Sequence, residues 1–180
     1  MIVRLAQSEW MRFVQSLPSN SSLLGATSDL GQFLFGAERA ALIRMAAPLA
    51  EVQQGLCFYC QRRVTAGEVD HFVPWSRYPR DLAHNLVLAH KQCNRQKSDL
   101  LAAENHLDRW IQRNQIESIA ISEAGRSASI IVDLPAVLSV AKWAYSHGAV
   151  LNAAAWVSGD TVEHLSDRWR TLLHTAVPAK

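Results

Sequence analysis

Two short motifs with the same spacing constrain this chain more than any other feature. They are Cys57-x2-Cys60 and His90-x2-Cys93. Two residues between ligands let a tight turn aim both side chains at one point, and two such turns supply the four ligands that tetrahedral zinc requires. Thiolate and imidazole are the ligand types that zinc prefers. The sequence therefore predicts a structural Zn²⁺ site, with no open position at the ion for chemistry.

Other interpretations of these residues stay open. A cysteine is often a small buried hydrophobe, and a single Cys-x2-Cys pair can be a redox pair. His84 competes with His90 as the fourth ligand, although its spacing to Cys93 is less suitable. The second pair, about thirty residues after the first, favours zinc. An odd count of three cysteines argues against a closed disulfide framework and for a reducing cytoplasm.

The charge of the chain is concentrated in one window. The 180 residues are 49% hydrophobic, which is enough for one sizeable core or two small ones, and the net charge is only +2. Residues 57–97 contain seven basic and three acidic side chains, a local excess of four, so the rest of the chain carries −2. A local positive charge attracts a polyanion to one face, although a solvated basic loop has the same composition.

The chain carries no signal for a membrane. Its first residues, MIVRLAQSEW, lack the basic and apolar regions of a signal peptide, and no apolar stretch is long enough to cross a bilayer. A cytoplasmic location is therefore expected.

Hydrophobic periodicity predicts helices on both sides of an irregular centre. Three regions are expected: a helical N-terminal flank, a central core of short segments, and a helical C-terminal region that packs on the core, at residues 1–54, 55–104 and 105–180. Helices are expected at 7–17, 37–53, 100–114, 135–147 and 160–176, with a further short one from a Ser28–Asp29 cap through Phe35. Residues 128–134 are either strand or helix. Four tryptophans are expected in the core: Trp110, Trp143, Trp156 and Trp169.

The centre itself shows turn residues and short apolar runs. Strands are expected near 68–73 and 86–89, joined by a long irregular loop, and a helix is expected to begin around Lys91. The fold class is therefore α+β and mostly helical.

A second set of polar residues lies close to the two ligand pairs in the sequence. Asp70, His71 and Asn85 fall between the two ligand pairs, and Asn94 follows directly after the second pair. Taken singly, an Asp-His pair is most often a surface or capping pair, and an asparagine is most often a turn residue or a helix cap. Their spacing relative to the cysteines is what favours a site.

The run CFYC…VDHFVPWS…HNLVLAHKQCNRQKSD closely resembles the HNH endonucleases, in the subgroup whose ββα-metal core is clamped by a four-ligand zinc knuckle. The resemblance covers about residues 55–100. Several features fall in register: the Cys-x2-Cys pair, Asp-His followed by an apolar residue and a proline, Asn-Leu, Cys-Asn and the lysine after it. His90 stands where the usual pattern has cysteine, and imidazole is also a competent zinc ligand.

The resemblance implies a role for each polar residue. His71 matches the general base that takes a proton from water, and Asn85 matches the residue that tethers the long loop. Asp70 and Asn94 match the ligands of one catalytic divalent ion, and their hard oxygens suit Mg²⁺ or Mn²⁺. Because successive strand side chains face opposite ways, the base and the metal ligand are expected to approach from different sides.

The implied activity is hydrolysis of phosphodiester bonds in DNA, most readily double-stranded DNA, leaving 5′-phosphate and 3′-hydroxyl ends. HNH cores serve several biological systems and the core does not say which; defence against foreign DNA is expected here by association only. Contacts to phosphates are expected from Arg77, Arg80, Arg95 and Lys97. Lys97 is the foremost of these because it lies three residues after Asn94 on one helix face. Trp75 and Tyr78 either stack on bases or pack the loop.

Two other functions stay open: a zinc-knuckle module that binds nucleic acid without cutting it, and a helical protein-interaction domain stapled by zinc. A homodimer is expected if both strands of a duplex are cut.

Overall fold

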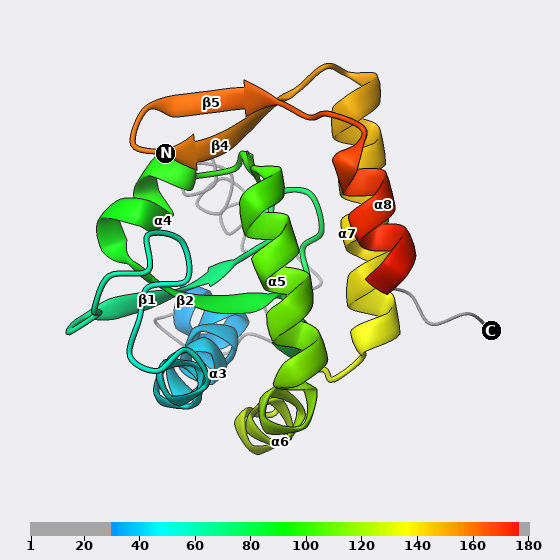
Figure 1. Ribbon diagram of the computed structural model, residues 1–180. Coiled ribbons are helices and arrows are strands. Elements are labelled where there is room, and N and C mark those ends of the chain that lie inside the picture. The colour runs from blue at the N-terminus through cyan, green and yellow to red at the C-terminus, as the bar shows by residue number, and fades with distance from the viewer. Residues whose placement is uncertain (1–29, 177–180) are drawn as a thin grey trace, which may run out of the picture. The chain divides into compact units, whose positions relative to one another are not determined.

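The computed structural model describes residues 30–176, and the side chains from residue 40 onward. The chain divides between Ala40 and Ala41 into two units, and the account below concerns the second. The described elements are α3 (Leu30–Val52), β1 (Gly67–His71), the short 3-10 helix η2 (Ala83–Asn85), β2 (Leu86–His90), α4 (Lys91–Lys97), β3 (Leu101–Ala102), α5 (Glu104–Ile116), α6 (Ser118–Ala128), α7 (Leu134–Val150), β4 (Ala154–Ser158), β5 (Thr161–His164) and α8 (Arg168–Ala176) (Figure 1). The expected class, α+β and mostly helical, is confirmed.

The centre of the second unit is a hairpin followed at once by a helix. Strands β1 and β2 pair antiparallel, with Asp70 opposite Val87 and His71 opposite Leu86. Helix α4 begins at the residue after β2, so the order is strand, strand, helix. The strands and helix expected for residues 68–73, 86–89 and from Lys91 are confirmed within a few residues.

Strand β2 is apolar along its length because both of its faces are covered. Leu86 and Leu88 belong to a buried cluster with Met45 and Leu49 of α3. Val87, on the opposite face, belongs to a second and larger buried cluster. A strand buried on both faces has a continuous apolar sequence instead of an alternating one.

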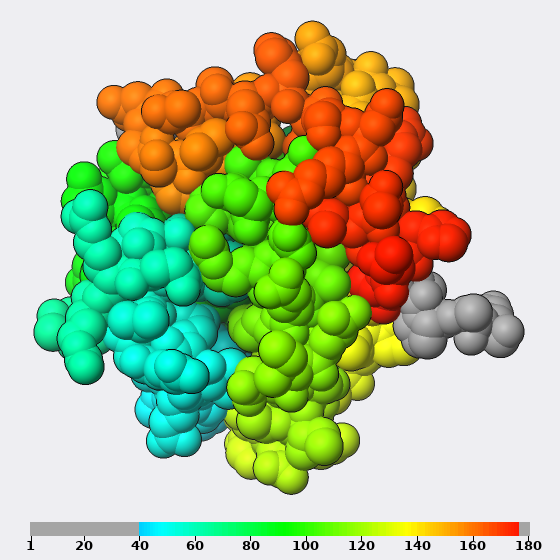
Figure 2. Space-filling model, viewed as in Figure 1, coloured from blue at the N-terminus to red at the C-terminus, as the bar shows by residue number. Residues whose placement is uncertain are grey.

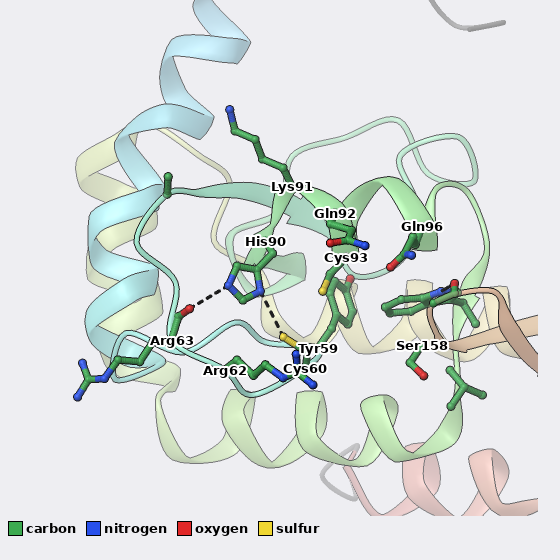
Figure 3. A pocket seen from close by; sticks show the side chains of 14 residues that line it. Tyr59, Cys60, Arg62, Arg63, His90, Lys91, Gln92, Cys93, Gln96 and Ser158 are labelled. Atoms are coloured by element: carbon green, nitrogen blue, oxygen red, sulfur yellow. Dashed lines mark hydrogen bonds between the residues drawn. The ribbon is translucent and has the colours of Figure 1, made fainter.

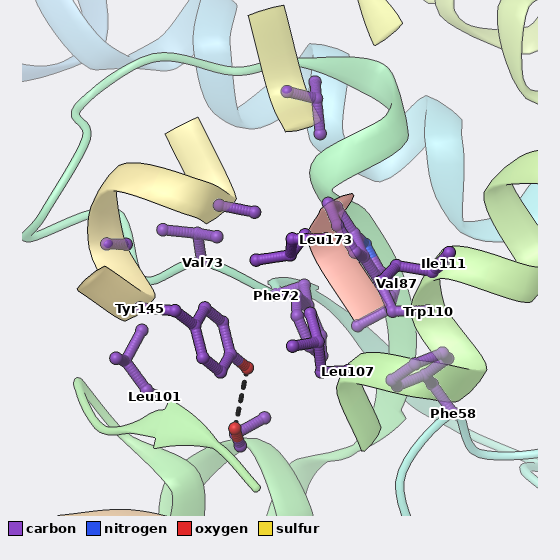
Figure 4. Close-up of a cluster of buried hydrophobic side chains, with 14 of the residues drawn as sticks. Phe58, Phe72, Val73, Val87, Leu101, Leu107, Trp110, Ile111, Tyr145 and Leu173 are labelled. Carbon is purple, nitrogen blue, oxygen red and sulfur yellow. Dashed lines mark hydrogen bonds between the residues drawn. The ribbon is translucent and has the colours of Figure 1, made fainter. Parts of the chain in front are cut away.

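The larger cluster joins the loop after β1 to the C-terminal helices (Figure 4). The ring of Phe72 stacks on Trp110 of α5 with centroids 4.7 Å apart. Tyr145 of α7 is fully buried and donates a hydrogen bond to the carbonyl of Ala102 at 2.7 Å, and Leu173 of α8 completes the packing. Figure 2 shows α5 and α8 side by side on the surface, with the loop that precedes β1 on the other side of α5.

The helix expected over residues 160–176 is wrong in its first half. Thr161–His164 form β5, which pairs antiparallel with β4, and α8 begins only at Arg168. Gly159 has a φ of +54° in the turn between the strands. Pairing with β4 overrides the helical pattern here, and the β-branched Thr161 and Val162 suit a strand.

Other expected elements change at their ends. Leu101 and Ala102, expected to start a helix, pair parallel with β4 as β3, and α5 begins at Glu104. The helix at 37–53 and the one ending near Phe35 are a single helix, α3, which contains Pro48. Helix α6 was not expected. Residues 129–133 link it to α7, with Ile131 bridged to Leu82.

Three of the four tryptophans are buried as expected, but Trp143 is 51% exposed on α7. The helix expected at 7–17 lies outside the described residues, and the boundaries of the three expected regions stay predictions. Among the described helices, none combines the length and the apolar character that crossing a membrane requires.

Candidate functional site

Four ligand atoms converge at the junction of β2 and α4. The Sγ atoms of Cys57, Cys60 and Cys93 and a ring nitrogen of His90 all lie within 4.8 Å of one another. Figure 3 shows three of these residues, Cys60, His90 and Cys93. Ligands bound tetrahedrally at about 2.3 Å lie about 3.8 Å apart. The first pair comes from the turn before β1, and the second comes from the end of β2 and the first turn of α4.

The orientation of His90 suits a zinc ligand. Its Nε2 lies 2.9 Å from the carbonyl oxygen of Arg63, so Nε2 carries the hydrogen and donates it. Nδ1 then presents its lone pair toward the cluster, 3.2 Å from Sγ of Cys60. A histidine that ligates zinc through one nitrogen and donates through the other to a fixed acceptor has this arrangement.

The charge of the cluster also favours a cation. Burial and the neighbouring Cys57 and Cys60 thiols raise the pKa of the Cys93 thiol to about 12. Three thiolates this close therefore repel one another unless a divalent ion lies between them. The residues fit Zn²⁺ as donors, and the ion would supply a fold constraint when bound, with no open coordination position.

His84, the alternative fourth ligand, lies elsewhere. It is buried in η2 with Nε2 3.3 Å from the carbonyl of Ser118, and burial lowers its pKa. Within the described part of the chain, the cluster contains His90 and not His84.

Asp70 and His71 leave β1 on opposite sides. The carboxylate of Asp70 is buried toward α4, where Oδ2 accepts a 2.6 Å hydrogen bond from the Tyr59 hydroxyl and lies 3.2 Å from Nζ of Lys97. The ring of His71 faces the long loop instead, with Nε2 2.7 Å from Oδ1 of Asp81. The divergence expected from strand alternation is therefore present in the hairpin.

Asn85 fastens the start of the long loop. Its side chain accepts a hydrogen bond from the peptide nitrogen of Val73 at 2.8 Å and donates one to the Val73 carbonyl at 3.0 Å. Its own carbonyl accepts from the peptide nitrogen of Phe72 at 2.8 Å. Asn85 thus makes three hydrogen bonds to the two residues that follow His71, Phe72 and Val73, and these bonds fix the start of the loop.

Asn94 lies on the face of α4 that covers β1. Its Nδ2 donates to Oε2 of Glu68 at 3.2 Å, and Glu68 lies two residues before Asp70 on the same side of the strand. Since the amide nitrogen is directed to Glu68, the Oδ1 atom of Asn94 stays available as a hard ligand. The Asp70 carboxylate and the Asn94 amide oxygen suit Mg²⁺ or Mn²⁺.

The structure corrects the expectation for Lys97. Its side chain shares the Asn94 face of α4, but it is completely buried between the core and Asp70. Nζ donates to the carbonyl of His71 at 3.0 Å and lies over the ring of Tyr59. Lys97 therefore positions the end of β1 and presents no ammonium group to an external phosphate.

Replacing Lys97 by methionine is expected to destabilise the fold by about 3–5 kcal/mol, because the Asp70 carboxylate then stays buried without its counter-charge. Urea unfolding of the zinc-loaded protein measures this. Arg95→Met, an exposed change in the same helix, serves as the control and should cost far less. Adding Asp70→Asn to Lys97→Met should recover part of the loss. Equal stability of the two single variants would contradict the buried pair.

The other residues expected near nucleic acid differ in exposure. Arg80 and Arg95 are exposed, whereas Arg77 is half-buried. Trp75 is 38% exposed, while Tyr78 packs against the larger buried cluster. Of the two aromatic residues, Trp75 is the more exposed.

Several residues of the site were missed from the sequence. Tyr59 lies between the ligands Cys57 and Cys60, and Asp81 and Glu68 are two of the three acidic residues in the window 57–97. A hollow of about 630 Å³ beside the cysteine cluster is lined in part by Arg62, Arg63 and Lys91 (Figure 3). No spacing rule distinguishes these residues from other polar residues of loops and helix ends.

The four-ligand cluster, the antiparallel hairpin and the helix that follows it define a zinc-knuckle ββα module. Residues 57–103 match the family model of the HNH endonucleases, so this segment of the chain is similar to an HNH endonuclease domain. The comparisons with curated proteins and with solved structures found no match.

Proposed function

We propose that the protein is a metal-dependent endonuclease that hydrolyses phosphodiester bonds in double-stranded DNA, leaving 5′-phosphate and 3′-hydroxyl ends. One observation carries the proposal: the end of β1 presents a carboxylate toward α4 and an imidazole toward the opposite side. The match of this segment to the HNH endonucleases supports it.

The residues on the two sides of β1 have different roles in the proposed reaction. Asp70 and Asn94 would hold one Mg²⁺ or Mn²⁺, and such an ion would supply polarisation of the scissile phosphate and stabilisation of the charge on the leaving 3′ oxygen. His71 takes a proton from the attacking water as the general base, which a neutral imidazole suits. Asn85 keeps the loop after His71 in place. The separation of base and ion ligand supports attack from the side opposite the leaving group.

The DNA contacts follow from the exposed basic residues. Arg80 and Arg95 are exposed near the site, and Arg77 is half-buried in the same loop as Arg80. The local excess of positive charge favours binding of a phosphate backbone, and such binding weakens steeply with salt.

Asn94→Ala is expected to raise the divalent-ion concentration needed for half-maximal cleavage by about 10-fold or more, because one ligand is lost. A titration of Mg²⁺ and Mn²⁺ against plasmid nicking measures the shift. Gln92→Ala, an exposed change on the same helix, is the matched control. An unchanged titration for Asn94→Ala would remove Asn94 from the ion site.

A plasmid-nicking assay on the zinc-loaded protein with a panel of divalent ions tests the function. Cleavage that requires added Mg²⁺ or Mn²⁺ supports the nuclease. Salt-sensitive binding in a gel shift without cleavage would favour a non-catalytic nucleic-acid-binding module. If the protein shows no DNA binding and no cleavage, the result favours a protein-interaction domain stabilised by zinc.

We also propose where the protein acts, in which oligomeric state and in which biological role. Three cysteines committed to one metal cluster suit a reducing cytoplasm, where thiols stay unoxidised. Cutting both strands of a duplex needs two sites or two successive events, so we include a homodimer, and we include defence against foreign DNA as the biological role.

A further inference from the structure

The closest polar contact of the His71 ring is with a residue outside the motif that marks the site. Oδ1 of Asp81 lies 2.7 Å from Nε2 of His71, and the two side chains are only 17% and 12% exposed. A carboxylate accepts hydrogen bonds and donates none when ionised. The hydrogen of the neutral imidazole is therefore on Nε2, and the lone pair is on Nδ1.

The backbone on both sides of this contact is fixed. The carbonyl of His71 accepts a hydrogen bond from the buried ammonium of Lys97. On the other side, Asp81 precedes Leu82, which bridges to Ile131, and Ala83 donates to the Ile131 carbonyl at 2.9 Å. The imidazole and the carboxylate are thus brought together by two separately anchored segments and not by a flexible loop end.

We propose that Asp81 is a positioning residue that fixes the tautomer and the direction of the His71 ring, so that Nδ1 faces the attacking water. The inference rests on the proposed nuclease function. In the reaction a water proton passes to Nδ1, the water oxygen bonds to phosphorus, and the bond from phosphorus to the 3′ oxygen breaks. Solvent then protonates the 3′ oxygen, and the proton on Nδ1 returns to solvent.

Asp81 also acts on the charged state that forms in this step. When Nδ1 gains the proton, the imidazolium keeps its Nε2 hydrogen bond to the Asp81 carboxylate. The bond to the ionised carboxylate is charge-assisted in both states, and the imidazolium adds a direct attraction between two opposite charges, which the neutral ring lacks. The contact is therefore stronger in the transition state than in the resting enzyme, which is the condition for acceleration of the chemical step.

Asp81→Ala and Asp81→Asn test the proposal in the zinc-loaded protein. Both are expected to lower kcat for plasmid nicking by about 10- to 100-fold, with KM for DNA changed less than about twofold. Asp160→Asn and Asp160→Ala, at the exposed turn between β4 and β5, are the matched controls. Nitrogen-15 NMR of the His71 ring should show the Nε2–H tautomer in the wild type and a mixture in Asp81→Ala.

The two readouts separate the possible failures. If the wild type does not cut DNA, the proposed function fails, and the tautomer signal still reports whether Asp81 orients the ring. If the wild type cuts and Asp81→Asn or Asp81→Ala retains its kcat, Asp81 has no positioning role. An unchanged tautomer in Asp81→Ala also overturns the inference. Should Asp81→Ala fail to fold, the nearly isosteric Asp81→Asn carries the kinetic test.

Discussion

Replacing His71 by alanine is expected to lower plasmid nicking by about 100- to 10,000-fold, the range that a positioned general base contributes. The attacking water then has no nearby acceptor for its proton. The His71 ring contacts Asp81 of the loop and belongs to neither buried hydrophobic cluster nor to the cysteine cluster, so its removal leaves the hairpin and the cysteine cluster in place. Zinc content and melting temperature should stay close to those of the wild type.

The matched control for this variant is His164→Ala, which removes an exposed imidazole from β5. Both variants are compared in single-turnover nicking with saturating Mg²⁺, so that binding and chemistry are separated. Wild-type activity in His71→Ala would exclude His71 as the base. A loss of zinc in His71→Ala would show instead that the substitution damages the fold.

Replacing Cys60 by serine is expected to release the zinc and unfold the hairpin and α4. A structural zinc contributes on the order of 10–16 kcal/mol of apparent binding free energy in small metal-folded modules, and that energy is available only to the folded chain. Cys60 is exposed, so the cost comes from the lost ligand and not from a cavity. Zinc analysis and thermal melting measure both effects together.

His90→Cys is the control for Cys60→Ser. It replaces one competent ligand by another and is expected to retain zinc, although the hydrogen bond from Nε2 to Arg63 is lost. If His90→Cys retains zinc and Cys60→Ser loses it, the stability of the fold depends on having four competent zinc ligands. A folded, active and zinc-free Cys60→Ser protein would contradict the zinc-knuckle model.

The metal cluster and the polar residues around it could be predicted because their spacing is local. Two ligands separated by two residues indicate a tight turn, and the opposite directions of Asp70 and His71 follow from strand alternation. Each inference therefore needs only a few neighbouring residues. The choice between His84 and His90 also followed from spacing, and the structure agrees with it.

What could not be predicted depends on distant parts of the chain. The spacing of Lys97 from Asn94 predicts which face of the helix Lys97 occupies. It does not predict that the Lys97 side chain is buried, because burial depends on the core beneath α4. The partnership of Asp81 with His71 depends on where a long loop returns. Residues 161–164 follow a helical pattern, yet pairing with β4 decides their structure.

Helix α5 supplies hydrogen-bond donors to the segment that matches the HNH endonucleases. Arg113 donates to the carbonyls of Leu86 and His84 at 2.6 and 2.7 Å, and Arg109 donates to those of Phe58 and Tyr59. Carbonyl groups of the matched segment thus receive their partners from a helix that begins after that segment ends. Transplanting residues 57–103 into another protein would leave these acceptors unsatisfied, so the matched segment depends on α5 and would not be stable when moved by itself.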